Sequence, residues 1–372
     1  MFVEYYKSNQ LQEYSDSEIT WITSIETCLI VFAGVIVGRL YDIFGPAPLM
    51  IPGTILMTFG IMMTSICTKY YQFILAQGIC TSLGAALVFN PCISSLSTWF
   101  IKKRATALGL ANAGSSLGGV VIPFLFRGVE LKVGFGWGVR AVGFLVLVFS
   151  TIACFTVSSR IKPPGRQPIR FYHTYIRPFK SLSFSLSALG ICLVYWGVFI
   201  PISFIPSHAV AHGFSATMAV YLISIQNGVS TLGRIIPGIM ADKLGRFNTY
   251  VMGVYVTALF TVALWIPAKT HAAIIAYAAM YGFWSGIAVT VWQPMIAEIS
   301  PLNEVGARLG AVSAALSFSS LLGAPVAGAI ISSNNGQYYG AAIFAAVMMV
   351  SGGTVTQVAR LIITNGKWLV AK

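Results

Sequence analysis

Charged residues, and acids in particular, are scarce in this sequence. Of its 372 residues 9% are charged, only 10 are Asp or Glu, 56% are hydrophobic, and the mean hydropathy is +0.79. A soluble domain carries about 25% charged residues, because its surface faces water. This chain lacks the polar residues needed for such a surface. The composition therefore predicts an all-α membrane protein that crosses a lipid bilayer many times.

Other absences exclude several classes of function. The chain has only four histidines, and its six cysteines lie in apolar segments without the spacing of metal ligands. It contains no Gly-x4-Gly-Lys-Ser/Thr loop, which would indicate ATP binding, and no nucleophile and base at a recognisable spacing. We therefore expect no enzyme activity, no metal and no cofactor. His208 and His212 are four residues apart, and we expect both to be solvated in a loop without a third metal ligand.

Long apolar runs occupy most of the chain. A bilayer core of roughly 30 Å needs about 20 helical residues to cross it. Eleven segments meet this criterion, with edges good to a few residues: 19–38, 47–67, 73–95, 105–126, 138–158, 183–206, 216–240, 248–267, 272–296, 307–331 and 338–359.

A basic, proline-containing break, residues 159–182, separates the fifth segment from the sixth. It contains six Lys or Arg residues and no acid, so we expect it to lie on the cytoplasmic side of the membrane. Alternating outward from this break places the N-terminus outside and the C-terminus inside. The net charge of +13 thus indicates orientation in a bilayer, and no nucleic-acid partner is expected.

The two parts of the chain resemble each other. The stretch "GRLYDIFG" begins at Gly38, and "GIMADKLG" begins 200 residues later at Gly238. Gly109 and Gly310, which lie in two further similar stretches, are 201 residues apart. Such a repeat is typical of transporters built from two related helical bundles. We therefore predict bundles over 1–158 and 183–372, joined by a cytoplasmic linker at 159–182.

The second bundle has six predicted segments and the first has five. Aligning the two leaves segment 183–206 without a counterpart, which would lie upstream of Met1. We therefore expect that a first spanning helix is missing from this chain. The acid-rich opening "MFVEYYKSNQLQEYSDSE" would then be the external loop that follows it.

The repeated loops and the pattern of spans resemble the major facilitator superfamily. Further stretches are similar to its monocarboxylate porter family, and to the fungal branch in particular: "FVEYY", "SEITWITSIE", "YYQFILAQGICTSLGAALVFNP", "WFIKKRATALGLANAGSSLGG" and "GRIIPGIMADKLGRFN". The resemblance implies two pseudo-symmetric bundles and transport by alternating access. It also implies a small organic acid or related metabolite as substrate, and efflux of a fungal secondary metabolite is one such activity. A truncated chain that transports nothing, or a sensor on the same fold, stays open as an alternative.

The two loops resemble gating loops of that superfamily, in which an acid and basic residues hold the cytoplasmic side closed. The second loop keeps its basic residues, but Ile43 and Pro46 replace basic residues in the first, so we expect a weaker closure there. Turn formation alone is the alternative. The gating residues so predicted are Gly38, Arg39, Asp42, Gly45, Gly238, Asp242, Lys243, Gly245 and Arg246.

Arg234 is the main candidate for binding substrate. An arginine within a span costs roughly 2.5–3.5 kcal/mol on insertion scales, so it usually has a function. Asn227 and Ser230 share its helix face, and a guanidinium can bind a carboxylate through two hydrogen bonds. In animal members of the family an Asp and an Arg one turn apart on this helix handle proton and substrate, but here Ser230 takes the position of the Asp. Pairing of Arg234 with an acid or with helix-end carbonyls is the alternative.

Two further regions complete the predicted site. Tyr281 and Trp292 lie on one face of segment 272–296, beside Gln293 at a probable break, and are expected to contact an organic substrate; packing is the alternative. Glu26, the only acid within a span of the first half, is a candidate for proton coupling. Its alternative roles are a partner for Arg140 and an interfacial acid.

These expectations define one hypothesis about the whole chain. It is a secondary active transporter of a small, anionic molecule, with the lipid bilayer around it and no obligate protein partner. A proton symport mechanism is one form of it. We expect the plasma membrane as its location, with the vacuolar membrane as the alternative.

Overall fold

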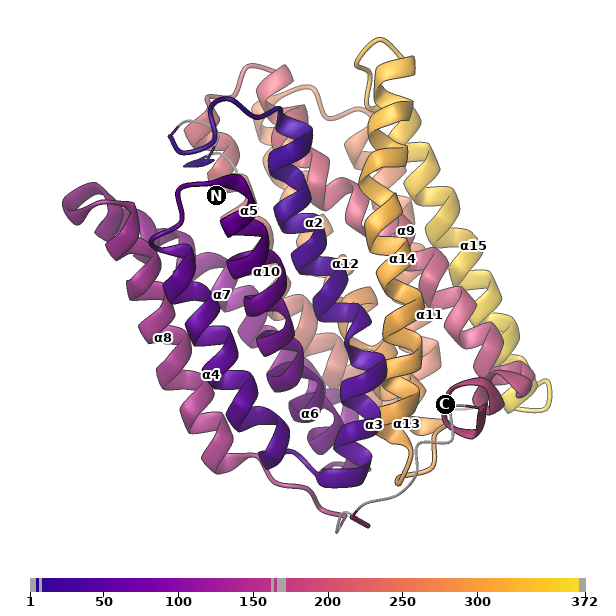
Figure 1. Ribbon diagram of the computed structural model, residues 1–372. Coiled ribbons are helices and arrows are strands. Elements are labelled where there is room, and N and C mark those ends of the chain that lie inside the picture. Colours follow the sequence, from indigo (N-terminus) through magenta and orange to yellow (C-terminus); the bar gives the residue numbers. More distant parts are fainter. Residues whose placement is uncertain (1–4, 7–8, 162–163, 166–171, 368–372) are drawn as a thin grey trace. The chain divides into compact units, whose positions relative to one another are not determined.

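The computed structural model describes residues 5–6, 9–161, 164–165 and 172–367, and within these residues the chain is helical without strands. Long helices joined by short turns make up almost all of it (Figure 1). Ten of its helices, counted over the described residues, are long and apolar enough to cross a membrane. The predicted all-α membrane fold is therefore confirmed.

The helices coincide with the predicted segments. Those before the basic linker are α2 (Asp16–Phe32), α3 (Gly34–Phe44), α4 (Ala47–Thr64), α5 (Tyr70–Phe73), η1 (Ile74–Thr81), α6 (Ser82–Trp99), α7 (Arg104–Val133) and α8 (Phe135–Thr156). The later helices are η2 (Tyr172–Ile176), η3 (Arg177–Lys180), α9 (Leu182–Ala211), α10 (Ala216–Leu244), α11 (Arg246–Phe260), η4 (Thr261–Trp265), α12 (His271–Thr290), α13 (Trp292–Glu298), α14 (Val305–Ser333) and α15 (Tyr339–Ile363).

The helix over predicted segment 216–240 differs from the other ten. Helix α10 has 29 residues, long enough to cross a bilayer, yet it is not among the ten apolar helices. Its polar residues lower its hydropathy, and they include Gln226, Asn227, Ser230 and Arg234. Eleven segments thus form long helical crossings, of which α10 is the polar one.

Local sequence sets the helix boundaries. Ser15 and Glu18 form a reciprocal capping box at the start of α2. Gly45 and Gly245, at φ 80° and 96°, end α3 and α10, because glycine adopts a positive φ without steric cost. The break predicted near Pro294 lies at Val291, between α12 and α13, and Pro294 itself is inside α13.

Contacts divide the chain into two compact units. Unit 1 contains Met1–Trp99, Val121–Arg170 and Pro301–Ser317, and unit 2 contains Phe100–Val120, Phe171–Ser300 and Phe318–Lys372. Each unit therefore includes a segment from the other half of the sequence: the start of α14 belongs to unit 1, and the start of α7 to unit 2. The boundaries at 158 and 183 stay a prediction.

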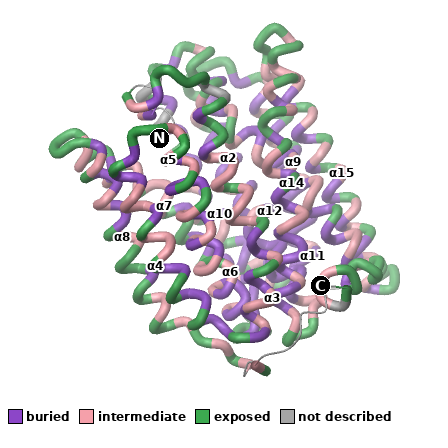
Figure 2. The backbone as a smooth tube through the Cα atoms, viewed as in Figure 1, coloured by how far each residue is buried: buried purple, intermediate pink, exposed green. Residues whose placement is uncertain are grey.

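Each unit has apolar side chains both inside and on its surface. In unit 1, Tyr6, Ile22 and Phe73 belong to one buried cluster. On α8, Phe149 and Phe155 are 64% and 87% exposed, and Figure 2 shows exposed stretches along that helix. Large apolar residues exposed along a helix are suited to contact lipid chains.

Candidate functional site

Arg234 lies on α10 where this helix crosses the start of α7, within unit 2. Its Nη1 atom donates a hydrogen bond to the backbone oxygen of Asn112, 2.7 Å away, and another to the Ser115 hydroxyl. Its Nε atom is buried without a hydrogen-bond partner. Among the described residues no carboxylate pairs with Arg234. The guanidinium is therefore anchored on one side and keeps N–H groups to donate on the other.

Asn112 links Arg234 to a second predicted residue. Its amide nitrogen donates to Gln293 Oε1 at 2.7 Å and to the carbonyl of Leu108 at 2.9 Å. Asn112 and Gln293 are 6% and 4% exposed, so this hydrogen bond is shielded from water. A buried hydrogen bond between two amide side chains fixes them relative to each other.

The other residues predicted on α10 flank the guanidinium. Asn227 donates to the Ile223 carbonyl at 3.1 Å, and its side chain packs so closely on Gly119 that an added Cβ there would lie 2.9 Å from it. Ser230 is 7% exposed. Arg234, Asn227 and Gln293 thus all contact the part of α7 that lies in unit 2, while Ser230 is buried one turn from Arg234 on α10.

The aromatic residues predicted for the site are in buried contacts. The Tyr281 hydroxyl donates to the Val198 carbonyl at 2.6 Å, and this side chain is fully buried. Trp292 contacts Tyr195 edge to face at 6.3 Å, and Tyr195 in turn donates to the Val289 carbonyl at 3.3 Å. Tyr281 therefore contacts α9 in this structure, in the manner of the packing alternative.

Glu26 lies in unit 1, in a short hydrogen-bond chain. Gln77 Nε2 donates to Glu26 Oε2 at 2.8 Å, and the Tyr6 hydroxyl donates to Gln77 Oε1 at 2.7 Å. Arg140 instead donates to Ser65 Oγ at 3.1 Å and lies over the Trp137 ring. The alternative in which Glu26 pairs with Arg140 is therefore wrong. In the described chain Glu26 has no cationic partner.

The acid of the second loop binds the start of α7, within unit 2. The Asp242 carboxylate accepts hydrogen bonds from the amides of Ala105 and Thr106 at 3.0 and 2.8 Å, and from the Thr106 hydroxyl at 2.8 Å. Arg246 pairs with Asp242 and with Glu298, both at 3.3 Å, and also donates to the Ile101 carbonyl. We call this arrangement the Asp242 contact. Lys243 is exposed and takes no part in it.

The acid of the first loop binds the start of α14 in the same manner, within unit 1. Asp42 accepts hydrogen bonds from the amides of Gly306 and Ala307 at 3.0 and 2.8 Å. Helix N-termini favour negative charge, because their first amides have no intrahelical partner. We call this arrangement the Asp42 contact. Among the described residues no basic side chain hydrogen-bonds to Asp42, and the Arg39 Nε atom is buried without a hydrogen-bond partner.

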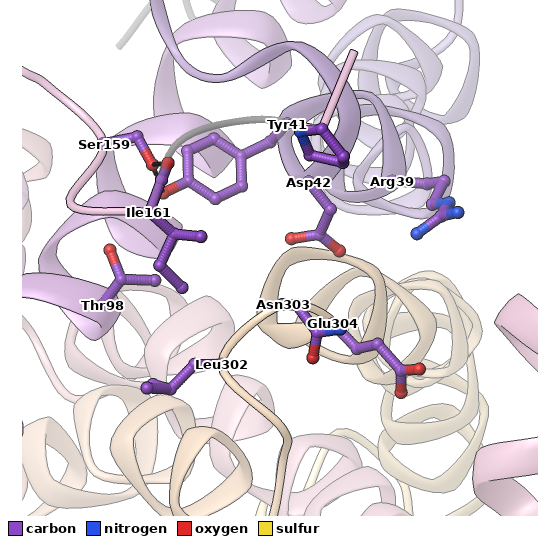
Figure 3. A pocket seen from close by; sticks show the side chains of 10 residues that line it. Arg39, Tyr41, Asp42, Thr98, Ser159, Ile161, Leu302, Asn303 and Glu304 are labelled. Carbon is purple, nitrogen blue, oxygen red and sulfur yellow. Dashed lines mark hydrogen bonds between the residues drawn. The ribbon is translucent and has the colours of Figure 1, made fainter. Parts of the chain in front are cut away.

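A cavity of about 320 Å³ adjoins the Asp42 contact. In Figure 3, Asp42 points toward the start of α14, while Tyr41 points toward Ser159, which its hydroxyl approaches to 3.5 Å. Glu304, also in the wall, pairs with Arg308 at 3.2 Å. The first loop thus has polar groups nearby, but no cation within residues 5–6, 9–161, 164–165 and 172–367 forms a hydrogen bond or ion pair that links them to Asp42.

Glycines let the helices meet at both contacts. A Cβ on Gly38 would lie 2.0 Å from the carbonyl oxygen of Gly306, and one on Gly238 would lie 2.7 Å from that of Ala105. A Cβ on Gly109 would lie 2.5 Å from the carbonyl oxygen of Arg234. Distances below 3.0 Å exclude a side chain unless the backbone moves, so these positions require glycine as long as the helices stay in contact.

Sequence reasoning missed the partners of these residues. Asn112 and Ser115 were not predicted, although "LANAGSS" places two polar residues at i and i+3 within an apolar span. The donors at Ala105, Thr106, Gly306 and Ala307 are backbone amides, so the side-chain types at these positions do not reveal the contact. Their position at the start of a predicted span, after the repeat is aligned, was the available clue.

The prediction for His208 was wrong. His208 lies in α9 rather than in a loop and is 5% exposed, because Trp265 and Tyr338 pack edge to face against its ring. In the described residues no group of three potential metal ligands is found.

The fold is that of known membrane transporters. The human organic anion transporter MFSD10 superposes with a TM-score of 0.75 at 14% identity, over 95% of this chain and 88% of that one. The E. coli fucose:proton symporter FucP gives a TM-score of 0.75 at 12% identity, over 96% and 94%. The chain therefore shares its fold with these two transporters.

The chain belongs to the Major Facilitator Superfamily. The profile of that family matches residues 4–281 and 188–364. A transporter of this superfamily from Gibberella moniliformis is 42% identical over 99% of this chain and 88% of its own length. The fujikurins efflux protein of Gibberella fujikuroi is 38% identical over 100% and 79%, and the aspyridones efflux protein of Emericella nidulans is 37% identical over 99% and 74%.

Proposed function

We propose that this transporter exports a small, acidic secondary metabolite by alternating access, as a fungal member of the monocarboxylate porter family. The names of the fujikurin and aspyridone efflux proteins support export of such metabolites, since both are similar to this chain over nearly its whole length. The carboxylate specificity is inferred from the residues described above.

Arg234 carries the proposal. One side of its guanidinium is held by Asn112 and Ser115, while Nε has no partner and no carboxylate is paired with it among the described residues. A partly buried cation without an acid is unfavourable, and a carboxylate that bonds Nε and Nη2 together would compensate its charge. This unmet charge supports Arg234 as the proposed binding site for the acidic group of the substrate.

The surrounding residues divide into two roles. Asn227, Ser230 and Gln293 offer polar groups near the guanidinium, and Trp292 offers an aromatic surface for the body of the substrate. Tyr281 acts indirectly, because its bond to Val198 fixes α12 against α9.

Alternating access requires that the Asp42 and Asp242 contacts open and close. Each contact joins a helix of one sequence half to a helix start of the other half: α3 to α14 in unit 1, and α10 to α7 in unit 2. If residues 1–158 and 183–372 move as two bundles, both contacts must break. The residues of the two loops are thus proposed to gate transport.

Glu26 is proposed to exchange the coupling proton. Its carboxylate accepts a hydrogen bond from Gln77, and it has no cationic partner among the described residues. A carboxylate in such surroundings can take up a proton more readily than one that is paired with a cation. Flux measured under opposite pH gradients would show whether the proton moves with the substrate or against it.

The test is export from proteoliposomes loaded with benzoate, fujikurin or aspyridone, at fixed protein content. Arg234→Ala should reduce the export rate at least tenfold, because the anion loses its buried counter-ion. Arg127→Ala, which removes an exposed arginine at the end of α7, is the matched control and should export like the parent chain. Equal rates for Arg234→Ala and the parent would remove Arg234 from the site.

Flux also separates the alternatives. A sensor, or a chain that transports nothing, would bind ligand without moving it in any of these assays. A fluorescent fusion would distinguish the plasma membrane, which an exporter of metabolites requires, from the vacuolar membrane.

A further inference from the structure

Unit 2 contains a second cavity, far from Arg234. It measures about 290 Å³ and is enclosed by the end of α9, the turn between η4 and α12, and the turn between α14 and α15. This end of the unit adjoins the start of α10. Arg234 lies about 27 Å further along that helix at 1.5 Å per residue. The cavity is therefore distinct from the site proposed for transport.

Two histidines at this cavity have settled proton positions. His208 Nε2 lies 2.9 Å from the Ala268 carbonyl, and His212 Nδ1 lies 2.8 Å from the His208 carbonyl. Because a carbonyl only accepts, both of these nitrogens carry a proton. The other nitrogen of His208, Nδ1, is buried without a hydrogen-bond partner on a side chain that is 5% exposed. A buried polar atom without a partner is costly, so it indicates a missing ligand group.

The charges around this cavity have one sign. Lys269 lies in its wall, and the titratable tyrosines of the wall are Tyr338, which packs on His208, and Tyr339. Burial raises the pKa of the Tyr338 phenol, so it stays neutral and can donate a hydrogen bond. The acids of unit 2 are Asp242 and Glu298, and both bond to Arg246 at the other end of α10. No acid of this unit compensates Lys269.

Aromatic rings form the remaining wall. Trp265 and Tyr338 each meet the His208 ring edge to face, at 6.2 and 5.0 Å, and Trp265 stacks on Tyr277. Rigid rings of this kind bind a flat apolar body, and a cation beside them selects an acidic group. The volume is at the lower end of the range for small-molecule sites, which suits a ligand of about the size of benzoate.

We propose that this cavity is a second binding site for a small organic carboxylate. The carboxylate pairs with Lys269, and the apolar body lies against Trp265 and Tyr338. His208 Nδ1 accepts a hydrogen bond from a water that the carboxylate holds.

The test is calorimetric titration of the full chain in lipid nanodiscs with benzoate, and with benzamide as the neutral probe of equal shape. We expect benzoate to bind at least tenfold more tightly than benzamide, because the amide carries no charge to pair with Lys269. Lys269→Met should weaken benzoate binding at least tenfold and leave benzamide binding unchanged. Lys132→Met, an exposed lysine in unit 1, is the control and should leave binding unchanged.

Arg234→Ala distinguishes this site from the transport site, and the thermal unfolding of each variant shows that it is folded. Benzoate binding that persists in Arg234→Ala and is lost in folded Lys269→Met supports the second site, even if the proposed function fails. Benzoate binding that persists in Lys269→Met and is lost in Arg234→Ala overturns it and leaves the proposed function intact. Slower export by Lys269→Met would identify the occupant as cargo, and unchanged export as a separate ligand.

Discussion

The Asp42 contact and the Asp242 contact use one device in two environments. In each, a carboxylate three residues before a glycine accepts hydrogen bonds from two successive amides at a helix start, at 3.0 and 2.8 Å. The two aspartates are 200 residues apart, and the amides they bind are 201 residues apart. The repeat in sequence is therefore also a repeat in hydrogen bonding.

The two contacts differ in what surrounds the carboxylate. Asp242 has Thr106 and Arg246 as additional donors, whereas Asp42 accepts from only the two amides in the described part of the chain. Four residues before Gly38 the first copy has Gly34, where the second copy has Arg234. Backbone geometry has thus been kept in both halves, while the charged side chains are concentrated in the second. A hydrogen bond to backbone amides tolerates such divergence, because it does not depend on the partner's side chain.

The largest increase in hydrogen exchange at a contact is expected for Asp242→Ala. This change removes the bonds to Ala105 and Thr106 and leaves Arg246, whose side chain is 11% exposed, with Glu298 as its only acid. Breaking a buried pair costs about 3 kcal/mol or more, which is roughly a hundredfold in an equilibrium. Hydrogen exchange measured by mass spectrometry should become that much faster at residues 105–106. Unchanged exchange there would show that α7 starts equally well without the acid.

Asp42→Ala should have the same effect on a smaller scale. It removes two charge-assisted bonds, worth about 2 kcal/mol together, and breaks no ion pair among the described residues. Exchange at residues 306–307 should accelerate by about thirtyfold, with residues 105–106 as the internal control. A larger acceleration than that caused by Asp242→Ala would reverse the predicted order of the two contacts.

Gly38→Ala tests the steric part of the comparison. Its added methyl group would lie 2.0 Å from the Gly306 carbonyl, against 2.7 Å from the Ala105 carbonyl for Gly238→Ala. Overpacking of this kind costs about 1–3 kcal/mol, so Gly38→Ala should open its contact more than Gly238→Ala opens the other. Exchange at 306–307 and at 105–106 again reports each contact separately. Equal effects would mean that the helices at Gly38 separate easily.

The smallest effect is expected for Glu298→Gln. Glu298 is 27% exposed in its side chain and pairs with Arg246 at 3.3 Å, so the pair contributes about 0.5–1 kcal/mol. Exchange at 105–106 should accelerate by about fivefold or less, and the difference should shrink at high salt. An effect as large as that of Asp242→Ala would mean that the ion pairs of Arg246 stabilise the contact more than the hydrogen bonds from Asp242 to the amides of α7 do.

Much of the fold could be predicted from spacing alone. The eleven apolar segments became long helices, because burial in lipid leaves a helix no alternative that satisfies its backbone. The polar character of α10 and the position of Arg234 within it were also visible. His208 was misplaced because the sequence does not show that α9 continues past Pro206 or that Trp265 and Tyr338 cover the ring.

The amino-acid sequence by itself determined that this is a repeated, all-helical membrane protein with one arginine deep in a polar span. Composition and periodicity suffice for that, since both follow from the solvent around each helix. Only the tertiary structure decided what the key side chains touch: Asn112 for Arg234, the helix starts for the two aspartates, and the aromatic wall for His208. Several of these partners are backbone atoms, and several lie over a hundred positions away in the sequence. Only the folded chain brings them together.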